Sequence, residues 1–327
     1  MEGKNLSKNQ NHTDIEEKEH EEKQEKAQKV LNTLGVAVDT GLMIENARVR
    51  LQVRQSHLKL QKRKDPVADK LLREVGALEE AIDKIVSDLL NEHPAYPWFS
   101  QIKGVGKENI GKVIGLIDIE KADTISSLWK FAGYAVDPDG HAPRRVKGRK
   151  LEYNARLRTM CWRMASSLLR AKGSYYKYYL SQKELLEIRK KNEGFSIVPA
   201  AKLPRKKIAK RGSDGAVQVK DKREESSNVI SEGHIHNMAL RKMIKLFLSH
   251  LWLVWREEAG LPLTKPYAID KMKHKSFITA YEMVDKKAKT KKVSDFRHIK
   301  VSRKPAEIEP KKKQPKAKVK VSKRKKA

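Results

Sequence analysis

The chain has 327 residues and a strong positive charge, because 72 Lys and Arg stand against 41 Asp and Glu and give a formal net charge of +31. Such an excess attracts a polyanion, and nucleic acid is the commonest one because neutralised phosphates release condensed counterions. No apolar run is long enough to span a bilayer, the charged N-terminus lacks the apolar stretch of a secretory signal, and the single cysteine, Cys161, excludes a disulfide within the chain. We therefore expect a cytoplasmic protein that binds DNA, or structured RNA, and no membrane.

The first hundred residues predict a charged tail followed by a helical arm. Residues 1–35 have few hydrophobic side chains and no periodicity, which predicts a disordered tail. Residues 36–97 are expected to form the arm. Apolar residues recur there at spacings of three and four, which predicts the seam of an antiparallel hairpin or a short coiled coil. These residues are Val75, Leu78, Ile82, Ile85 and Leu89. A homodimer through residues 42–90 is an open alternative to a hairpin within one chain.

The most informative segment is residues 102–114, where an apolar residue precedes Gly104-Val105-Gly106 and a second apolar helix follows. This order is typical of a helix-hairpin-helix. The two glycines let the chain reverse tightly and bring backbone N–H groups of the next helix close to a phosphate. We expect Lys107 and Lys112 to add positive charge beside these groups. The alternative is an ordinary helical hairpin whose glycines only permit the turn.

We place a compact helix-hairpin-helix domain at residues 98–192. After the hairpin, the pattern predicts a short helix over residues 125–134 that ends at glycine, a polar loop over 137–150, and a long amphipathic helix over 151–179 that Gly173 interrupts. The loop and the start of the long helix are rich in cations and supply the other predicted phosphate contacts. These are Arg144, Arg145, Lys147, Arg149, Lys150, Arg156 and Arg158.

The rest of the chain reads as a linker, a helical segment and a tail. Residues 193–232 lack periodicity and are rich in Gly, Ser, Lys and Asp, so we expect a mobile linker. Residues 233–284 predict a helical segment whose apolar face continues to Trp255. Residues 285–327 predict a disordered lysine-rich tail that binds nucleic acid without sequence preference. The fold class is therefore mainly α, with disordered charged termini.

Two groups of residues raise the question of other chemistry. Asp137, Asp139 and His141 carry atoms that ligate Mn²⁺ or Zn²⁺, but Asp-Pro-Asp-Gly is common turn chemistry and we expect a turn. His234 and His236 precede a predicted helix, where histidines more often cap the helix or contact a polar neighbour than bind a metal. Their role stays open, and no metal site is predicted.

Three of these motifs, in their order, resemble the C-terminal domain of the insertion-sequence one-ten, one-sixteen and nine-oh-two transposases. They are Gly104-Val105-Gly106, then Leu128-Trp129-Lys130-Phe131-Ala132-Gly133-Tyr134, and after the basic loop Asn154-Ala155-Arg156-Leu157-Arg158. Residues 233–256 also resemble a C-terminal extension of some relatives, so the similarity covers about residues 42–267. It implies DNA binding associated with transposition and recombination, in a prokaryote or a mobile element, close to the nucleoid.

The chain lacks both groups of catalytic residues that this family uses. The family has a ribonuclease-H-like domain whose acidic residues hold two divalent metals, and a loop serine that attacks a phosphodiester. Neither is found in this sequence, since residues 136–145 contain no serine. The catalytic residues are therefore unknown, and Mg²⁺ is expected only in an active transposase complex.

Three functions remain open at this stage. The first is a DNA-binding transposase relative without a complete catalytic site. The second is an active transposase or recombinase subunit with an unrecognised nucleophile or a catalytic domain supplied by a partner. The third is a chromatin-like protein that coats nucleic acid through its lysine-rich tail.

Overall fold

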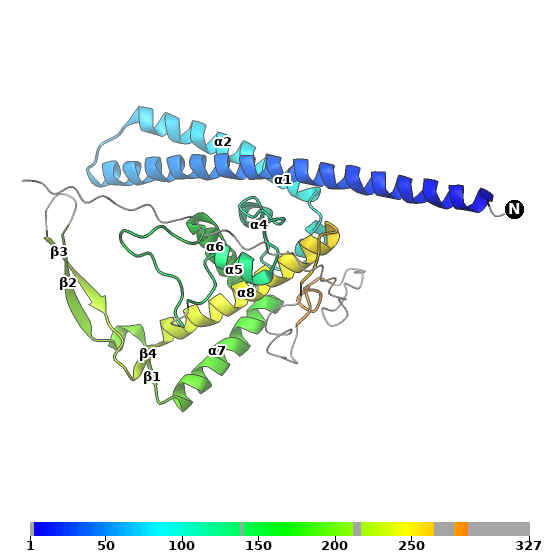
Figure 1. Cartoon of the computed structure of the whole chain (residues 1–327). Helices are drawn as coiled ribbons and strands as arrows, with labels where there is room; N and C mark the ends of the chain where they lie inside the picture. The colour runs from blue at the N-terminus through cyan, green and yellow to red at the C-terminus, as the bar shows by residue number, and fades with distance from the viewer. Residues whose placement is uncertain (1–2, 138–139, 212–216, 265–277, 287–327) are drawn as a thin grey trace, which may run out of the picture.

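The computed structural model describes residues 3–137, 140–211, 217–264 and 278–286, and this part of the chain is mainly helical, as predicted (Figure 1). A long helical arm lies along one side of a compact helical body, and a two-stranded ribbon lies at one end of that body. Residues 287–327, which make up almost all of the predicted lysine-rich tail, lie outside the described residues.

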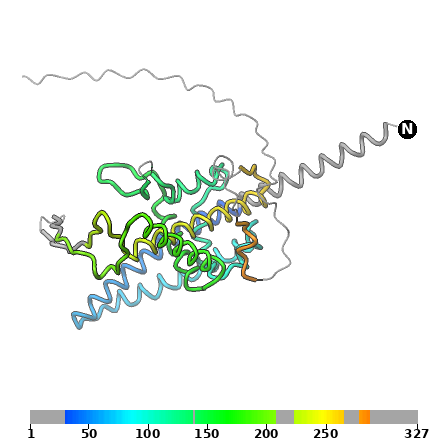
Figure 2. The backbone as a smooth tube through the Cα atoms, turned by 90° about the horizontal axis from the view of Figure 1, so that it is seen from below, coloured from blue at the N-terminus to red at the C-terminus, as the bar shows by residue number. Residues whose placement is uncertain are grey.

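The arm is an antiparallel hairpin of α1 (Gly3–Leu60) and α2 (Pro66–Asn91), which lie side by side in both views (Figures 1 and 2). Asp65 begins α2, because its side chain accepts a hydrogen bond of 3.1 Å from the N–H of Ala68. Pro66 fits the first helical position because no intrahelical partner exists there for an N–H group. The predicted hairpin within one chain is therefore present.

The seam of this hairpin differs from the predicted one. The buried apolar residues of α2 are Ala68, Ile82, Val86 and Leu90. Only Ile82 belonged to the predicted set, while Leu78 and Ile85 are about half exposed, at 49% and 51%. The reason is that α2 packs against α4 as well as against α1, and a Cβ on Gly111 of α4 would lie 2.5 Å from Val86. The local spacing does not reveal this second neighbour.

The predicted N-terminal tail, residues 1–35, extends too far at its C-terminal end, because residues 30–35 belong to α1 and lie against the body. Helix α1 begins at Gly3, and Leu34 near its middle is fully buried in the core. Gly35 lies against the body, where a Cβ would be 3.4 Å from the carbonyl oxygen of Gly115. Residues 30–35 are thus ordered by apolar partners that lie far away in sequence, which composition alone does not indicate.

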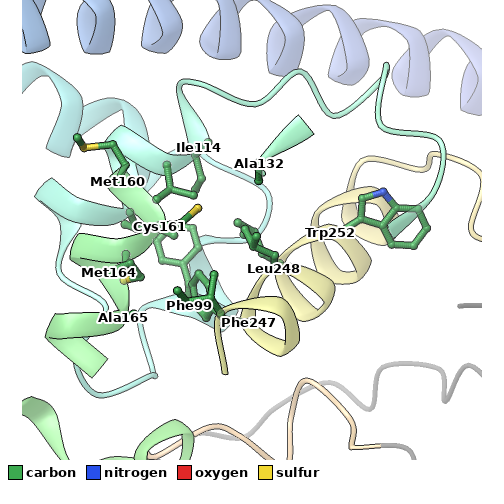
Figure 3. Close-up of a cluster of buried hydrophobic side chains, with 14 of the residues drawn as sticks. Phe99, Ile114, Ala132, Met160, Cys161, Met164, Ala165, Phe247, Leu248 and Trp252 are labelled. Atoms are coloured by element: carbon green, nitrogen blue, oxygen red, sulfur yellow. The ribbon is translucent and has the colours of Figure 1, made fainter. Parts of the chain in front are cut away.

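The body is built from short helices around α8 (Glu232–Glu258). These are α3 (Tyr96–Phe99), α4 (Lys107–Ile114), α5 (Ile125–Phe131), α6 (Ala155–Ala171) and α7 (Ser174–Asn192). Residues 251–256 of α8 are all buried, which is the pattern of a helix surrounded by protein. Figure 3 shows Phe247, Leu248 and Trp252 of α8 in the same apolar cluster as Met160 and Met164 of α6.

The predicted linker contains regular structure instead. Strand β1 (Ser196–Val198) pairs in parallel with β4 (Val229–Ser231), and a 3₁₀ turn, η1 (Ala200–Lys202), follows β1. Strands β2 (Arg205–Arg211) and β3 (Val217–Arg223) form a separate antiparallel ribbon. Three-residue strands are too short to show a period, and the partner of β1 lies about thirty residues further along the chain. A local sequence pattern therefore does not predict this pair of strands.

A buried histidine ties α8 to two other segments. The His250 ring lies 2.8 Å by Nδ1 from the hydroxyl of Tyr175 and 2.9 Å by Nε2 from the carbonyl oxygen of Ile278. Because a carbonyl only accepts, Nε2 carries the proton, and Nδ1 accepts from Tyr175. Burial lowers the pKa of His250 from 6.5 to about 4.

We expect His250 to stay neutral until the pH approaches 4, because its folded-state pKa lies below its unfolded value. The neutral ring stabilises the fold above pH 6.5, and about 3 kcal/mol of this stability is lost as the pH falls toward 4. NMR of the ring nitrogens as a function of pH measures both the tautomer and the pKa. A titration near pH 6.5 would contradict the buried arrangement.

Candidate nucleic-acid interface

The hairpin turn precedes α4 and leaves the first N–H groups of that helix without a side-chain cap. Gly104 has φ +90°, and the turn closes with a hydrogen bond of 3.2 Å from the N–H of Val105 to Ile102. Gly106 is the residue before α4 and has no side chain to accept from the helix. Uncapped N–H groups at a helix start, together with the helix dipole, favour an anion. The predicted geometry of the turn is present.

The two glycines of the turn have different roles. A Cβ on Gly104 would lie 2.8 Å from the Cβ of Ala171 and 2.9 Å from the carbonyl oxygen of Ser167, both on α6. Gly106 has φ −82° and no heavy atom within 4 Å of its ideal Cβ. Val105 between them is partly buried and packs against the core. Gly104 therefore holds the turn against α6, and Gly106 is the exposed glycine of the pair.

Asp285 holds the hairpin turn through hydrogen bonds to the backbone. The sequence predicts this residue as the first of the disordered tail, residues 285–327. Its carboxylate accepts hydrogen bonds from the N–H of Lys103 at 2.8 Å and from the N–H of Ser174 at 2.7 Å. The N–H groups of Asp285 and Lys286 both donate to the carbonyl oxygen of Gln101 at 3.2 Å. One side chain thus joins the hairpin to the start of α7, across more than a hundred residues of sequence.

Lys107 lies beside the uncapped helix start, as expected. Its Nζ donates to Oδ1 of Asn91 at 2.7 Å and lies 5.5 Å from the centre of the Tyr96 ring. The neighbouring Glu108 is exposed and acidic. These contacts hold the Lys107 side chain against the end of α2. Because neither partner is charged, the ammonium keeps its positive charge and remains a candidate phosphate contact.

Lys112 is buried, so its prediction as a phosphate contact is wrong. Its Nζ donates to Glu45 of α1 at 3.2 Å and to Glu108 at 3.0 Å, and Arg163 of α6 donates to Glu45 at 3.1 Å. Burial opposes the charge of Lys112, but the hydrogen bonds and charges of Glu108 and Glu45 outweigh it and raise its pKa. Burial likewise opposes the Glu45 carboxylate, and Arg163 and Lys112 outweigh it and lower its pKa. The lysine joins α4 to the arm.

Replacing Glu45 by Gln should lower the free energy of unfolding by about 3 kcal/mol, because it leaves Lys112 and Arg163 without their shared counter-charge. The matched control is Glu74→Gln. Glu74 pairs with Lys70 on the surface of α2 at 3.8 Å, and the loss there should be under about 0.5 kcal/mol. Denaturant unfolding of the full chain measures both, and equal losses would show that the buried pair has no special weight.

The basic loop between α5 and α6 exposes five of the predicted cations. Arg144, Arg145, Lys147, Arg149 and Lys150 are all exposed. The predicted turn before them is present in its described residues, since the N–H of Asp137 donates to His141 at 2.8 Å and Gly140 has φ +81°. Asp139 lies outside the described residues. The loop therefore presents a dense positive surface to the outside.

Arg158 and Arg156 hold the structure around this loop. Arg158 donates to the carbonyl oxygen of Pro143 at 2.8 Å, and its guanidinium lies 4.8 Å from the centre of the Tyr153 ring. Arg156 is exposed but forms an ion pair with Asp39 of α1. Arg158 thus anchors the loop, and the paired Arg156 has less charge to offer a phosphate than the five loop residues.

The hairpin and the basic loop are two separate surfaces. The turn packs against Ser167 and Ala171 at the end of α6, whereas the loop leads into the first turn of that helix. At 1.5 Å per residue, the two lie about 20 Å apart along α6. The single basic surface that the sequence suggested is therefore divided.

The histidines that the sequence places before a helix, His234 and His236, lie in the first turns of α8 and contact polar neighbours. Nδ1 of His234 lies 2.7 Å from Glu225, the Ser231 side chain caps α8 by accepting from the N–H of His234 at 3.1 Å, and His236 lies 2.7 Å from the hydroxyl of Tyr179. Among the described residues, no group of three or more His, Cys, Asp and Glu is arranged to hold a metal ion, and no helix has the length and apolar character to cross a membrane.

Comparison of the chain with protein-family models and with curated proteins gives no match. The resemblance to insertion-sequence transposases therefore rests on the three sequence motifs alone. Sequence reasoning missed Glu45 and Asp285, since neither lies in a motif and each acts on a segment far along the chain.

Gly104→Ala should destabilise the fold by at least about 2 kcal/mol, because it combines a left-handed backbone with a clash against α6. Gly106→Ala provides the matched control, because its Cβ enters open space at an ordinary φ, and the expected cost is under about 1 kcal/mol. Thermal unfolding of the two variants measures the difference. Equal stability would mean that the turn does not pack as described.

Proposed function

We propose that the protein is a DNA-binding protein of the insertion-sequence transposase type that grips the phosphate backbone and lacks a complete catalytic site of its own. The observation that carries the proposal is the uncapped start of α4 behind a Gly104-Val105-Gly106 turn, on a body whose adjoining loop exposes five cations. Backbone N–H groups and loop cations bind phosphates of any sequence, so this grip positions DNA without reading bases.

The second and third of the motifs that carry the resemblance pack against each other in the body. The N–H of Asn154 donates to Phe131 at 2.8 Å, and the hydroxyl of Tyr134 donates to the carbonyl oxygen of Arg158 at 3.1 Å. Gly133, with φ +73°, leaves room for Tyr153, whose ring a Cβ would approach to 2.8 Å. The second and third motifs thus form one packed unit, and the proposed family assignment itself rests on the order of the motifs along the chain.

The spacing of the two surfaces suits a duplex. A separation of about 20 Å corresponds to about six base pairs at 3.4 Å per pair, so the hairpin and the loop can contact different phosphates of one duplex. Mg²⁺ has no part in this binding, and it enters only where a partner brings a catalytic domain.

Neutralising the loop should weaken DNA binding and its dependence on salt. Replacing Arg144, Arg145, Lys147, Arg149 and Lys150 by Gln should reduce the slope of log affinity against log salt by about 4 units if all five neutralise phosphates. A control variant replaces the exposed Lys59, Lys84, Lys177 and Lys191 by Gln. Fluorescence anisotropy with a labelled duplex measures both, and equal slopes for loop variant and control would refute the loop as an interface.

The competing functions give different outcomes with the same protein. Incubation with supercoiled DNA and Mg²⁺ should give binding without nicks, joined products or covalent adducts, whereas a metal-dependent cut would favour an active transposase. Deletion of residues 287–327 should weaken binding but leave the effect of the loop replacements intact. Loss of nearly all affinity on that deletion would favour a coating protein that acts through its tail.

A further inference from the structure

The ribbon of β2 and β3 is a second concentration of positive charge that neither the hairpin nor the loop includes. Its fourteen paired residues contain eight Lys or Arg and one acid, Asp221. The four of these basic residues whose exposure is described, Arg205, Lys206, Lys207 and Arg223, all lie on the surface. The ribbon forms a sheet of its own, and in Figure 1 it lies at one end of the body.

The cross-strand register places like charges directly opposite one another. Arg205 pairs with Arg223, and Lys206 pairs with Lys222. Like charges opposite each other in an antiparallel pair are destabilising, and a two-stranded ribbon alone is marginally stable in water. One acid offsets part of this repulsion, since Lys206 forms an ion pair with Glu224 at 3.3 Å. A ribbon of this charge is stabilised when a polyanion lies along it.

The register also separates two faces, because directly paired residues of a ribbon share one face and neighbours along a strand alternate. One face holds Lys206, Lys210, Lys220 and Lys222 with Ile208 and Gln218, and it holds no acid. The other face contains Arg205, Lys207, Arg211 and Arg223 together with Asp221. The first, which we term the lysine face, is the more uniformly positive of the two.

We infer that the ribbon enters the major groove of B-form duplex DNA, with the lysine face along the phosphates. This rests on the proposed function and deepens it, because it states how the ribbon contacts a B-form DNA duplex. The major groove of B-DNA is about 12 Å wide and admits a two-stranded ribbon, whereas the major groove of A-form RNA is too deep and narrow. Strands of seven residues are about 23 Å long, which spans about seven base pairs.

The test compares a labelled DNA duplex with an RNA duplex of the same sequence, using the full chain. In the lysine-face variant, Lys206, Lys210, Lys220 and Lys222 are replaced by Gln. We expect its affinity for DNA to fall about 10- to 100-fold near physiological salt and its salt slope to fall by about 3 to 4 units. Its affinity for RNA should change by less than about threefold. The matched control is the variant of Lys59, Lys84, Lys177 and Lys191 described above, with the same loss of charge.

A second variant removes the ribbon itself. The N–H of Glu224 donates to the carbonyl oxygen of Pro204 at 3.1 Å, so the two ends of the ribbon are already adjacent and an Asn-Gly turn can replace residues 205–223. This deletion should reduce DNA affinity at least as much as the lysine-face variant while the thermal unfolding of the helical body is unchanged. The deletion variant keeps the test valid if β2 and β3 of the lysine-face variant do not pair.

Three results would overturn the inference. The first is that the lysine-face variant and the deletion both bind DNA as tightly as the control. The second is that the variant loses affinity for both duplexes equally. The third is that vesicles of phosphatidylserine bind the wild type and lose that binding in the variant, while DNA binding is unaffected. Failure of the proposed function is a different result, because the wild-type protein would then bind neither duplex.

Discussion

The burial of α8, which is complete on every side over residues 251–256, is the constraint on which the rest of the structure depends. A helix with a continuous apolar surface is unstable in water, and each large side chain it buries contributes about 1.5–3 kcal/mol. α5, α6 and α7 and residues 278–286 cover it. Two of its buried polar side chains are hydrogen-bonded to the body, since Trp252 donates to Ala122 at 2.6 Å and Arg256 donates to Ile119 at 2.7 Å. This rigid centre gives the hairpin turn and the basic loop fixed positions.

The cations of this chain divide into those that build the structure and those that face outward. Lys112 and Arg163 converge on Glu45 and join the body to the arm, and Arg158 anchors the loop at Pro143. These cations are bound to partners within the protein. Removing a cation would leave the Glu45 carboxylate or the Pro143 carbonyl oxygen without its partner. The loop arginines and lysines and the ribbon remain on the surface, where a polyanion reaches them. The net charge of the chain is therefore larger than the charge that is available to the proposed interface.

The turn, the basic loop and the ribbon are three separate surfaces, and they present two kinds of phosphate-binding group. Backbone N–H groups bind a phosphate at a fixed point, whereas exposed cations follow the backbone over a longer distance. Asp285 belongs to this arrangement as well, because it ties the turn to the start of α7 and keeps the hairpin rigid. A rigid turn loses little conformational entropy on binding, so under the proposed function more of its interaction energy is available to hold a phosphate.

The sequence by itself determined the features that depend on neighbours along the chain. The Gly104-Val105-Gly106 turn, the helix that ends before Gly133, the break at Gly173 and the apolar α8 all follow from local conformational preferences and periodicity. Only the tertiary structure decided which side of α2 is buried, that Lys112 pairs with Glu45 sixty-seven residues away, that Asp285 is ordered, and that residues 193–232 contain strands. These outcomes depend on partners that are distant in sequence. A local pattern contains no information about which charged or apolar residues of other segments will pack against it after folding.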